Sequence, residues 1–322
     1  MKTRILNTAR LSFPLASALA ALLSAPSLHA GQIWDGGGAD NNWTTANNWD
    51  SNTLPTFTNA ITFAGGTRLT PNNNRADAST VGGINFTNTA TNAFTLGGNS
   101  ITLGGNISTT AATSGSLTDT INLAVILNAT RTVTTNTNHN LTINGVISQS
   151  AASGLTKAGA ATLTLGGANT YAGTTTIQGG TLRLANPSAV GGSSGITMNT
   201  ASNTLSIGTD SAMALPGLTG SSGSFTYTIV SDRATAGEGL THGFSGANFG
   251  NATFATNAGS NVTSGTAGIT FSGSPTIGGG GTGTATFAPG SADLTLPSLT
   301  AINASKTLAL AGTGNGFITG VI

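Results

Sequence analysis

The stretch that decides the fold is residues 154–186, which read GLTKAGAATLTLGGANTYAGTTTIQGGTLRLAN. Two runs in it, residues 162–165 and 181–184, alternate apolar and polar residues, the period of a strand with one buried face. Glycine pairs at 166–167 and 179–180 provide backbone that can turn sharply beside these runs. The stretch therefore predicts short strands that are separated by glycine turns.

The same pattern continues on both sides of this stretch. Further alternating runs occupy residues 93–98, 100–105, 140–145, 225–229 and 307–310. The first three of them end in Gly-Gly or Asn-Gly. Leu, Ile and Phe fall on one face of each run and mostly Thr on the other, and β-branched Thr suits an exposed strand face. No segment after residue 30 has a convincing 3.6-residue period, so we expect an all-β chain.

Two all-β architectures compete, a sandwich or barrel of hairpins and a solenoid of stacked coils. The sequence TLGGN at residues 95–99 recurs at 102–106 and, as TLGGAN, at 164–169. Such internal similarity favours a β-solenoid with coils of about twenty residues. Stacking also accommodates ladders of Thr and Asn at the strand spacing of about 4.8 Å, and it disfavours like charges directly opposite each other.

Composition excludes several classes of protein. Charged residues are 6% of the chain, hydrophobic residues are 38%, and there is no cysteine. The chain is too apolar and too weakly charged for typical disorder, and too poor in helix formers for a helical enzyme. The arginines after residue 30 (Arg68, Arg75, Arg131, Arg183 and Arg233) are far apart in sequence, which argues against a nucleic-acid partner.

The N-terminus resembles a secretory signal peptide. Lys2, Arg4 and Arg10 precede an apolar run at 11–23, and small residues surround a cleavage position after Ala30. A membrane anchor is the alternative, but the apolar run is short for one. Removing residues 1–30 leaves seven basic and nine acidic residues, and no later segment predicts a transmembrane helix. We expect the mature chain to be exported.

Residues 154–186 closely resemble the autotransporter-associated β-strand repeat of secreted passenger proteins from Gram-negative bacteria. The matching positions are Leu155, Thr156, Lys157, Gly159, Leu163, Leu165, Ala168, Asn169, Tyr171, Gly173, Thr174, Thr175, Ile177, Gly179, Gly180, Thr181, Leu182 and Leu184. Ala161 departs from the pattern, where the repeat usually has a second glycine. The resemblance implies a right-handed parallel β-helix on the outer surface of a Gram-negative cell. It implies a translocated scaffold rather than a particular chemistry.

Trp34, Trp43 and Trp49 are the only tryptophans, and they lie within sixteen residues of one another. They predict either a cap over the first coil, which a solenoid end needs, or a platform on which sugars stack. Exposed rings favour the platform and buried rings the cap. We therefore divide the chain into a signal peptide (1–30), an N-terminal cap with the first strands (31–65) and a β-helix repeat region (66–322). The last residues resemble the start of another repeat, so we expect this region to be incomplete at its C-terminus.

Two glycine motifs resemble those of enzymes. Residues 278–283 fit GxGxxG and residues 191–195 fit GxSxG. A pyrophosphate loop and a nucleophile elbow both require a following helix, which the sequence does not predict. We therefore interpret both segments as turns.

Candidate acid–base residues are few. We expect His139 and His242 to be solvated loop residues, and no histidine pair has metal-binding spacing. The nine acids never occur two residues apart, although Asp232, His242 and a serine could meet in space. Asp35 and Asp40 could together supply oxygen ligands to Ca²⁺, but turn capping by each is the better interpretation. We predict no catalytic, cofactor or metal site.

The sequence thus predicts an extracellular or cell-surface structural and adhesive β-helix protein that is not an enzyme. Its partners would be a surface polysaccharide or the surface of a host or neighbouring cell, after contact with the export machinery through the signal peptide. A glycan-binding β-helix is the first alternative. A polysaccharide lyase or glycoside hydrolase is the second, and it would need acids gathered from distant coils.

Overall fold

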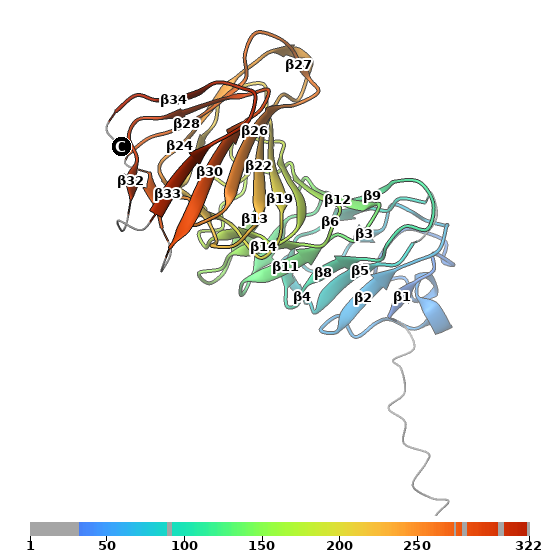
Figure 1. The fold of residues 1–322 in the computed structure, drawn as a ribbon. Helices are drawn as coiled ribbons and strands as arrows, with labels where there is room; N and C mark the ends of the chain where they lie inside the picture. The colour runs from blue at the N-terminus through green and yellow to red at the C-terminus, as the bar shows by residue number, and fades with distance from the viewer. Residues whose placement is uncertain (1–31, 89–91, 274, 279–281, 302–305, 321–322) are drawn as a thin grey trace, which may run out of the picture.

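A computed structural model describes residues 32–88, 92–273, 275–278, 282–301 and 306–320. The expected signal peptide lies outside these residues. The described chain is all-β, and its strands form a solenoid of about eleven turns (Figure 1). Every pairing between named strands is parallel, as a solenoid requires and a hairpin fold does not. Two short 3-10 segments near the N-terminus, η1 (Ala46–Asn48) and η2 (Asp50–Asn52), interrupt this pattern.

One long sheet runs along the whole solenoid. Its strands, in spatial order, are β1 (Ile33–Trp34), β2 (Ala60–Phe63), β5 (Gly83–Phe86), β8 (Ile107–Thr109), β11 (Arg131–Thr134), β14 (Leu155–Ala158), β16 (Thr175–Ile177), β18 (Ile196–Met198), β21 (Leu218–Gly220), β25 (Ala247–Asn248), β29 (Thr276–Ile277) and β32 (Thr300–Ala301). Because β1 and β2 belong to this sheet, solenoid pairing begins before residue 66.

A second sheet forms the next side of each coil. Its strands are β3 (Asn72–Asn73), β6 (Thr95–Gly98), β9 (Leu117–Ile121), β12 (His139–Ile143), β15 (Thr162–Leu165), β17 (Gly180–Leu184), β19 (Asn203–Gly208), β22 (Thr226–Asp232), β26 (Thr253–Ala258), β30 (Gly283–Pro289) and β33 (Lys306–Leu310). All the alternating runs of the sequence except 100–105 lie in this sheet, and in β15 and β19 leucine and isoleucine are inside and threonine is outside. The run 100–105 forms a strand of the third side.

The third side is split into two sheets. The four-stranded sheet contains β4 (Ser79–Val81), β7 (Ile101–Leu103), β10 (Val125–Leu127) and β13 (Ile147–Gln149). The five-stranded sheet contains β20 (Ala214–Leu215), β24 (Thr241–Phe244), β28 (Gly268–Phe271), β31 (Asp293–Leu296) and β34 (Gly316–Ile318). Between β13 and β20 the third side has no strands in the described chain. Residues 154–186, the segment that decides the fold, lie in this part of the sequence.

Coil length changes along the solenoid. Leu141 pairs with Leu163 and Leu163 with Leu182, offsets near the expected twenty residues. Farther on, Tyr227 pairs with Phe254 and Phe254 with Phe287, so coils become longer. Part of the extra length forms a projection, here called the lateral arm (residues 233–240 and 259–267). It contains the two-stranded sheet of β23 (Gly237–Glu238) and β27 (Val262–Ser264), and the β27 end stands out from the solenoid in Figure 1.

The core is one continuous cluster of aliphatic and aromatic side chains inside the coils. Inner residues stack directly on their register partners, as in the column Tyr227, Phe254 and Phe287. Stacking removes apolar surface from water at about 25 cal/mol per Å² and needs no disulfide. This arrangement explains how a chain without cysteine buries a core in a narrow solenoid.

Candidate functional site

The three tryptophans lie together and are fully buried, at 0% exposure each. Trp34 meets Trp49 edge-on with ring centroids 5.3 Å apart, and Trp43 stacks on Phe57 at 6.0 Å. The Arg75 guanidinium lies over Phe57, the ring on which Trp43 stacks, at 3.9 Å from its centroid. The indole faces are therefore covered by protein, and none is free to stack on a sugar in this arrangement.

Asp35 and Asp40 act on their own turns. The Oδ1 atom of Asp35 accepts the Gly37 N–H at 3.0 Å, and Oδ1 of Asp40 accepts the Asn42 N–H at the same distance. Hydrogen bonds from the Thr45 hydroxyl and the Asn42 amide lower the pKa of Asp40. Turn capping, the interpretation favoured from sequence, is confirmed. No group of three potential metal ligands occurs among the described residues.

The expectation that His139 is a solvated loop residue is wrong. His139 is completely buried on the inner face of β12, and Asp119 is completely buried on β9. His139 Nδ1 lies 2.6 Å from the Thr110 carbonyl oxygen, and Nε2 lies 2.6 Å from Oδ2 of Asp119. A carbonyl can only accept, so Nδ1 carries a proton and a second proton lies between Nε2 and the carboxyl group.

The carboxylate of Asp119 is also bonded on its other side. Its Oδ1 atom accepts the Phe94 N–H at 2.7 Å and the Asn88 amide at 3.1 Å. His139 and Asp119 can thus occupy inner positions, where apolar residues usually lie, because hydrogen bonds satisfy their polar atoms. With 0% exposure on both, the pair connects neighbouring coils and has no access to a substrate.

Lys157 is a second buried ionisable residue. Its stem lies between register partners Val133 and Ile177, and its ammonium donates to the carbonyls of Ala158, Gly159 and Gly179 at 2.8, 2.8 and 3.0 Å. Burial lowers its pKa to about 8. The group therefore remains protonated at neutral pH and joins two glycine corners of adjacent coils.

The expectation of a solvated His242 is also wrong. His242 is fully buried on the inner face of β24, two residues before Phe244. Its Nδ1 atom accepts the Met213 N–H at 3.1 Å, and its Nε2 atom has no hydrogen-bond partner among the described residues. Burial lowers its pKa to about 4.

The serine, histidine and aspartate considered from sequence do not form a triad in the described chain. The Asp232 carboxylate bonds to Arg183 and to the Asn261 N–H rather than to His242. The adjacent Ser231 hydroxyl donates to the Leu240 carbonyl. A relay from carboxylate to imidazole to hydroxyl is therefore missing at this place.

The GxSxG segment is a buried polar contact rather than a nucleophile elbow. Ser193 Oγ donates toward the carbonyls of Gly173 and Gly195 at 3.0 and 2.9 Å and contacts Thr175 Oγ1 at 3.0 Å. The Tyr171 hydroxyl reaches the same threonine at 2.8 Å. No imidazole or carboxylate of a described residue bonds to Ser193. The GxGxxG segment lies partly outside the described residues.

Charges that are distant in sequence meet at the base of the lateral arm. Arg183 Nη1 bonds to Asp232 Oδ2 at 2.8 Å, and Arg233 Nη2 lies 3.3 Å from Asp210 Oδ1. Burial alone raises the pKa of Asp232, but the Arg183 hydrogen bond and neighbouring amides keep it below its usual value. Hydrogen bonds from Thr235 lower the pKa of Asp210. Each acid has a basic partner, which leaves no free carboxylate pair for glycosidic chemistry here.

Hydroxyl groups form columns on the outer face of the second sheet. Register places Thr162, Thr181, Thr204 and Thr228 on consecutive strands. Where the column crosses β17, β19 and β22, the surface is hollowed into an open groove of ≈ 270 Å³. Its lining is Gly180, Thr181, Ser202, Asn203, Thr204, Thr226 and Thr228, without a charged side chain.

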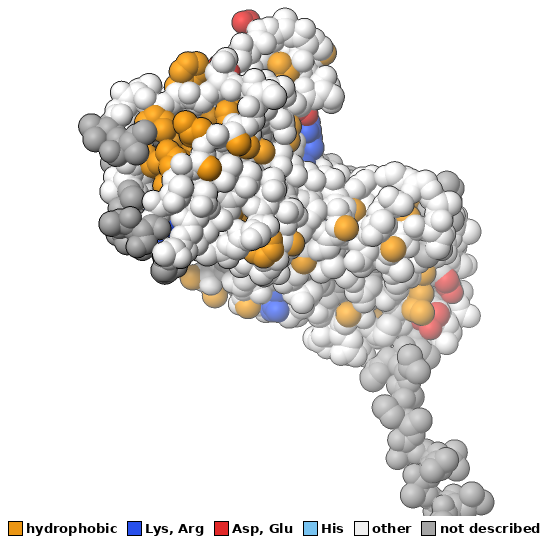
Figure 2. Space-filling view, viewed as in Figure 1, with side chains coloured by type: hydrophobic (Ala, Val, Ile, Leu, Met, Phe, Trp, Pro, Cys, Tyr) orange, Lys and Arg blue, Asp and Glu red, His pale blue; other side chains and the backbone are white. Residues whose placement is uncertain are grey.

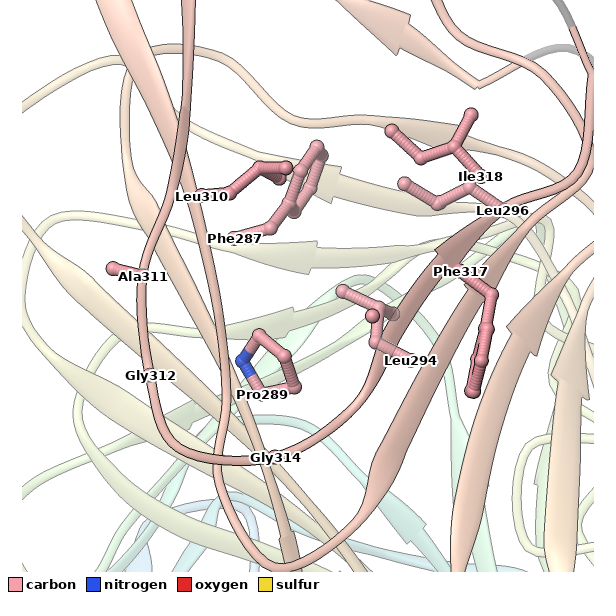
Figure 3. A pocket seen from close by; sticks show the side chains of 11 residues that line it. Phe287, Pro289, Leu294, Leu296, Leu310, Ala311, Gly312, Gly314, Phe317 and Ile318 are labelled. Carbon is pink, nitrogen blue, oxygen red and sulfur yellow. The ribbon is translucent and has the colours of Figure 1, made fainter.

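A more apolar pocket of ≈ 260 Å³ lies in the last coils. Figure 3 shows Phe287 and Leu310 on one side, Leu294 in the middle, and Leu296 and Ile318 opposite. Leu310 continues the column of Phe254 and Phe287 but is 70% exposed. Figure 2 shows hydrophobic side chains gathered over this end. The pocket therefore lies beside the exposed end of the inner column.

Comparison with known families gives one match. Residues 155–184 match the model of the passenger-associated-transport-repeat family. The resemblance of 154–186 to an autotransporter passenger β-helix repeat is thereby confirmed. The matched residues span β14 to β17 and contain one of the two third-side segments without a strand, between β15 and β16; the other follows β17. Searches of curated proteins and of solved structures returned no match.

No helix among the described residues is long and apolar enough to cross a membrane.

The two-residue period of the strands could have predicted that these polar residues are buried. Asp119 occupies a core position in the run Leu117, Asp119, Ile121, and Lys157 follows Leu155 at the same spacing. His139 and His242 likewise precede inner residues by two positions. Residue type alone, by contrast, predicts a solvated position for each of them.

Proposed function

We propose that this protein is an exported passenger that acts as a surface-exposed structural and adhesive scaffold without catalytic activity. The observation that carries the proposal is the passenger-associated-transport repeat, set inside a continuous parallel solenoid. A repeat of this kind suggests transport to the surface of a Gram-negative cell. The proposed signal peptide at residues 1–30 would direct the chain into export.

The outer faces support a role in contact rather than chemistry. They present hydroxyl and amide groups in register, and the buried ionisable groups described above are fully enclosed. The buried tryptophans favour the cap over the sugar platform, because a cap covers the end of the first coil and a platform needs exposed rings.

Glycan binding is the second candidate, and the uncharged groove at Thr181, Thr204 and Thr228 favours it. Hydroxyl-lined surfaces can exchange hydrogen bonds with a neutral polysaccharide without desolvating charge. In this form the binding site would be the groove rather than the tryptophans.

The test is a glycan-array and polysaccharide-turnover screen on the chain from which residues 1–30 have been removed, with far-ultraviolet circular dichroism to verify β structure. The scaffold proposal expects binding without turnover. Product release that is abolished by changing a single aspartate would overturn it. Failure to bind any glycan or any cell surface tested would remove the adhesive part.

Matched variants separate the two candidates. Changing Thr181, Thr204 and Thr228 to Val removes three groove hydroxyls while keeping strand propensity and shape. We expect at least a tenfold loss of affinity if the groove binds glycan. Changing Thr142 and Thr164, outside the groove lining, to Val is the control. Equal losses in both variants would exclude the groove.

A further inference from the structure

The inference begins with the proton on His242. Because Nδ1 accepts the Met213 N–H, the neutral ring carries its single proton on Nε2. Nε2 lies near the Asp232 backbone but forms no hydrogen bond there, and the side chain is fully buried. A second proton would have to enter at Nδ1, where it would face the Met213 N–H. The closed structure therefore accommodates only the neutral imidazole.

The charged groups around His242 are already paired. On β22, the Asp232 carboxylate bonds to Arg183 and Asn261, and beside β20, Asp210 bonds to Thr235 and Arg233. Within the described chain, neither the exposed Glu238 of β23 nor Asp293 of β31 forms an ion pair with His242, and β28 contributes Ile269 as its register partner. An imidazolium here would have no described counter-ion.

His242 also lies where the lateral arm rejoins the solenoid. The chain leaves the second sheet at Asp232 and returns to the third side at Thr241. Ser231 Oγ donates to the Leu240 carbonyl at 2.8 Å and closes the base of the arm. One residue beyond His242, the Gly243 N–H donates to the Met213 carbonyl at 2.9 Å. Movement of His242 would therefore disturb the β20–β24 pairing and the base of the arm together.

We propose that His242 is a proton-operated latch that keeps the base of the lateral arm closed at neutral pH and opens it in acid. Protonation transfers the ring from the core to water. The first strand of the five-stranded sheet then separates from β24, and the arm loses its attachment at Leu240. Residues far from this place keep their pairing, because a solenoid can open locally.

The size of the effect follows from linkage. The pKa of His242 is about 4 in the closed form, and an opened, solvated histidine returns to about 6.5. A folded-state pKa below the open-state value means that closure is favoured above pH 6.5 and weakens as pH falls toward 4. We expect the opening equilibrium to rise about 100-fold between pH 7 and pH 4.

The experiment is native-state amide hydrogen exchange on the full chain, followed by NMR or mass spectrometry between pH 7 and pH 4. After correction for intrinsic rates, the Met213, Gly243 and Ser245 amides should lose protection as pH falls. The variant His242→Asn keeps an acceptor at the δ position but does not titrate, so its protection should not change with pH. Amides beside His139, the other buried histidine, serve as the internal control.

Unchanged corrected exchange of Met213 and Gly243 down to pH 4 would overturn the latch. So would a simultaneous loss of protection at His139, since that would indicate global acid unfolding. If the His242→Asn variant fails to fold, direct NMR titration of His242 in the wild-type chain decides the question. An ordinary pKa near 6.5 in the closed fold would also contradict the proposal.

Discussion

Single residues in this solenoid decide how a polar group can occupy a core position. Lys157 keeps its aliphatic stem in the column between Val133 and Ile177 and places its charge among three carbonyl oxygens. Burial of the ammonium lowers the stability of the fold, and the hydrogen bonds to the three carbonyls, which a leucine could not make, partly offset this loss.

Lys157 gives the first prediction at this scale. Its pKa is about 8 when folded and about 10.5 when unfolded, so the unfolded chain binds more protons between these values. Stability should therefore rise as pH increases from 8 toward 10.5, by about 1 kcal/mol per pH unit near pH 9. Urea unfolding at pH 7.5, 8.5 and 9.5 measures this slope.

The variant Lys157→Met keeps the stem and removes the titrating group. Its stability should not show the extra rise over the same range, and the difference between the two chains isolates Lys157 from other groups. A parallel pH dependence in both chains would show that the ammonium is not the source.

The buried residues also show what sequence could and could not establish. The period of two assigns Asp119, His139 and Lys157 to inner faces, although residue type suggests the surface. Apart from Ala158 and Gly159 beside Lys157, their partners could not be predicted, because they come from other coils whose lengths vary. The bond from Arg183 to Asp232 spans 49 positions and depends on the register of two intervening pairings.

At the scale of elements, the third side of the passenger repeat has no strand, and a side chain adds to the backbone hydrogen bonds that join its coils. The Asn169 N–H donates to the Ser188 carbonyl at 3.0 Å and the Thr170 N–H to the Ile147 carbonyl at 2.9 Å. Asn169 is 3% exposed, and its Oδ1 accepts the Ile147 N–H at 2.7 Å while its Nδ2 donates to the Ala189 carbonyl at 2.8 Å. One amide thus links the last strand of the four-stranded sheet to the coil two turns later. Alternation and glycine turns predict the strands of this repeat, but they do not show that a side chain continues the ladder.

This bridge gives the second prediction. The variant Asn169→Ala leaves a buried N–H and a buried carbonyl without their partners, at about 1–3 kcal/mol for each. We expect a loss of about 2–5 kcal/mol in the free energy of unfolding, measured by urea denaturation. The exposed Asn144, whose amide donates to Asn122, is the matched control, and Asn144→Ala should cost less than about 0.5 kcal/mol. Equal costs at both sites would mean that Asn169 does not act as a bridge.

At the scale of the whole molecule, the two ends of the described solenoid differ. Figure 1 places them at opposite ends of the stack of coils. The first coil packs its inner side against Trp34, Trp43 and Trp49, whereas the last leaves Leu310 and Phe317 70% and 48% exposed. Because each coil contacts mainly its neighbours, opening should begin where the inner column is uncovered and spread along the axis.

This asymmetry gives the last prediction. After correction for intrinsic rates, amides of β33 and β34 should exchange at least tenfold faster than those of β2 and β5. Hydrogen exchange with mass spectrometry on the full chain measures both ends at once. The variant Trp49→Ala removes a buried ring and should lower the stability of the N-terminal coils by about 3–5 kcal/mol, which would reduce or reverse the gradient. If the first coil of the wild-type chain exchanges as fast as the last, the aromatic cluster does not stabilise that end, and its role as a cap is wrong.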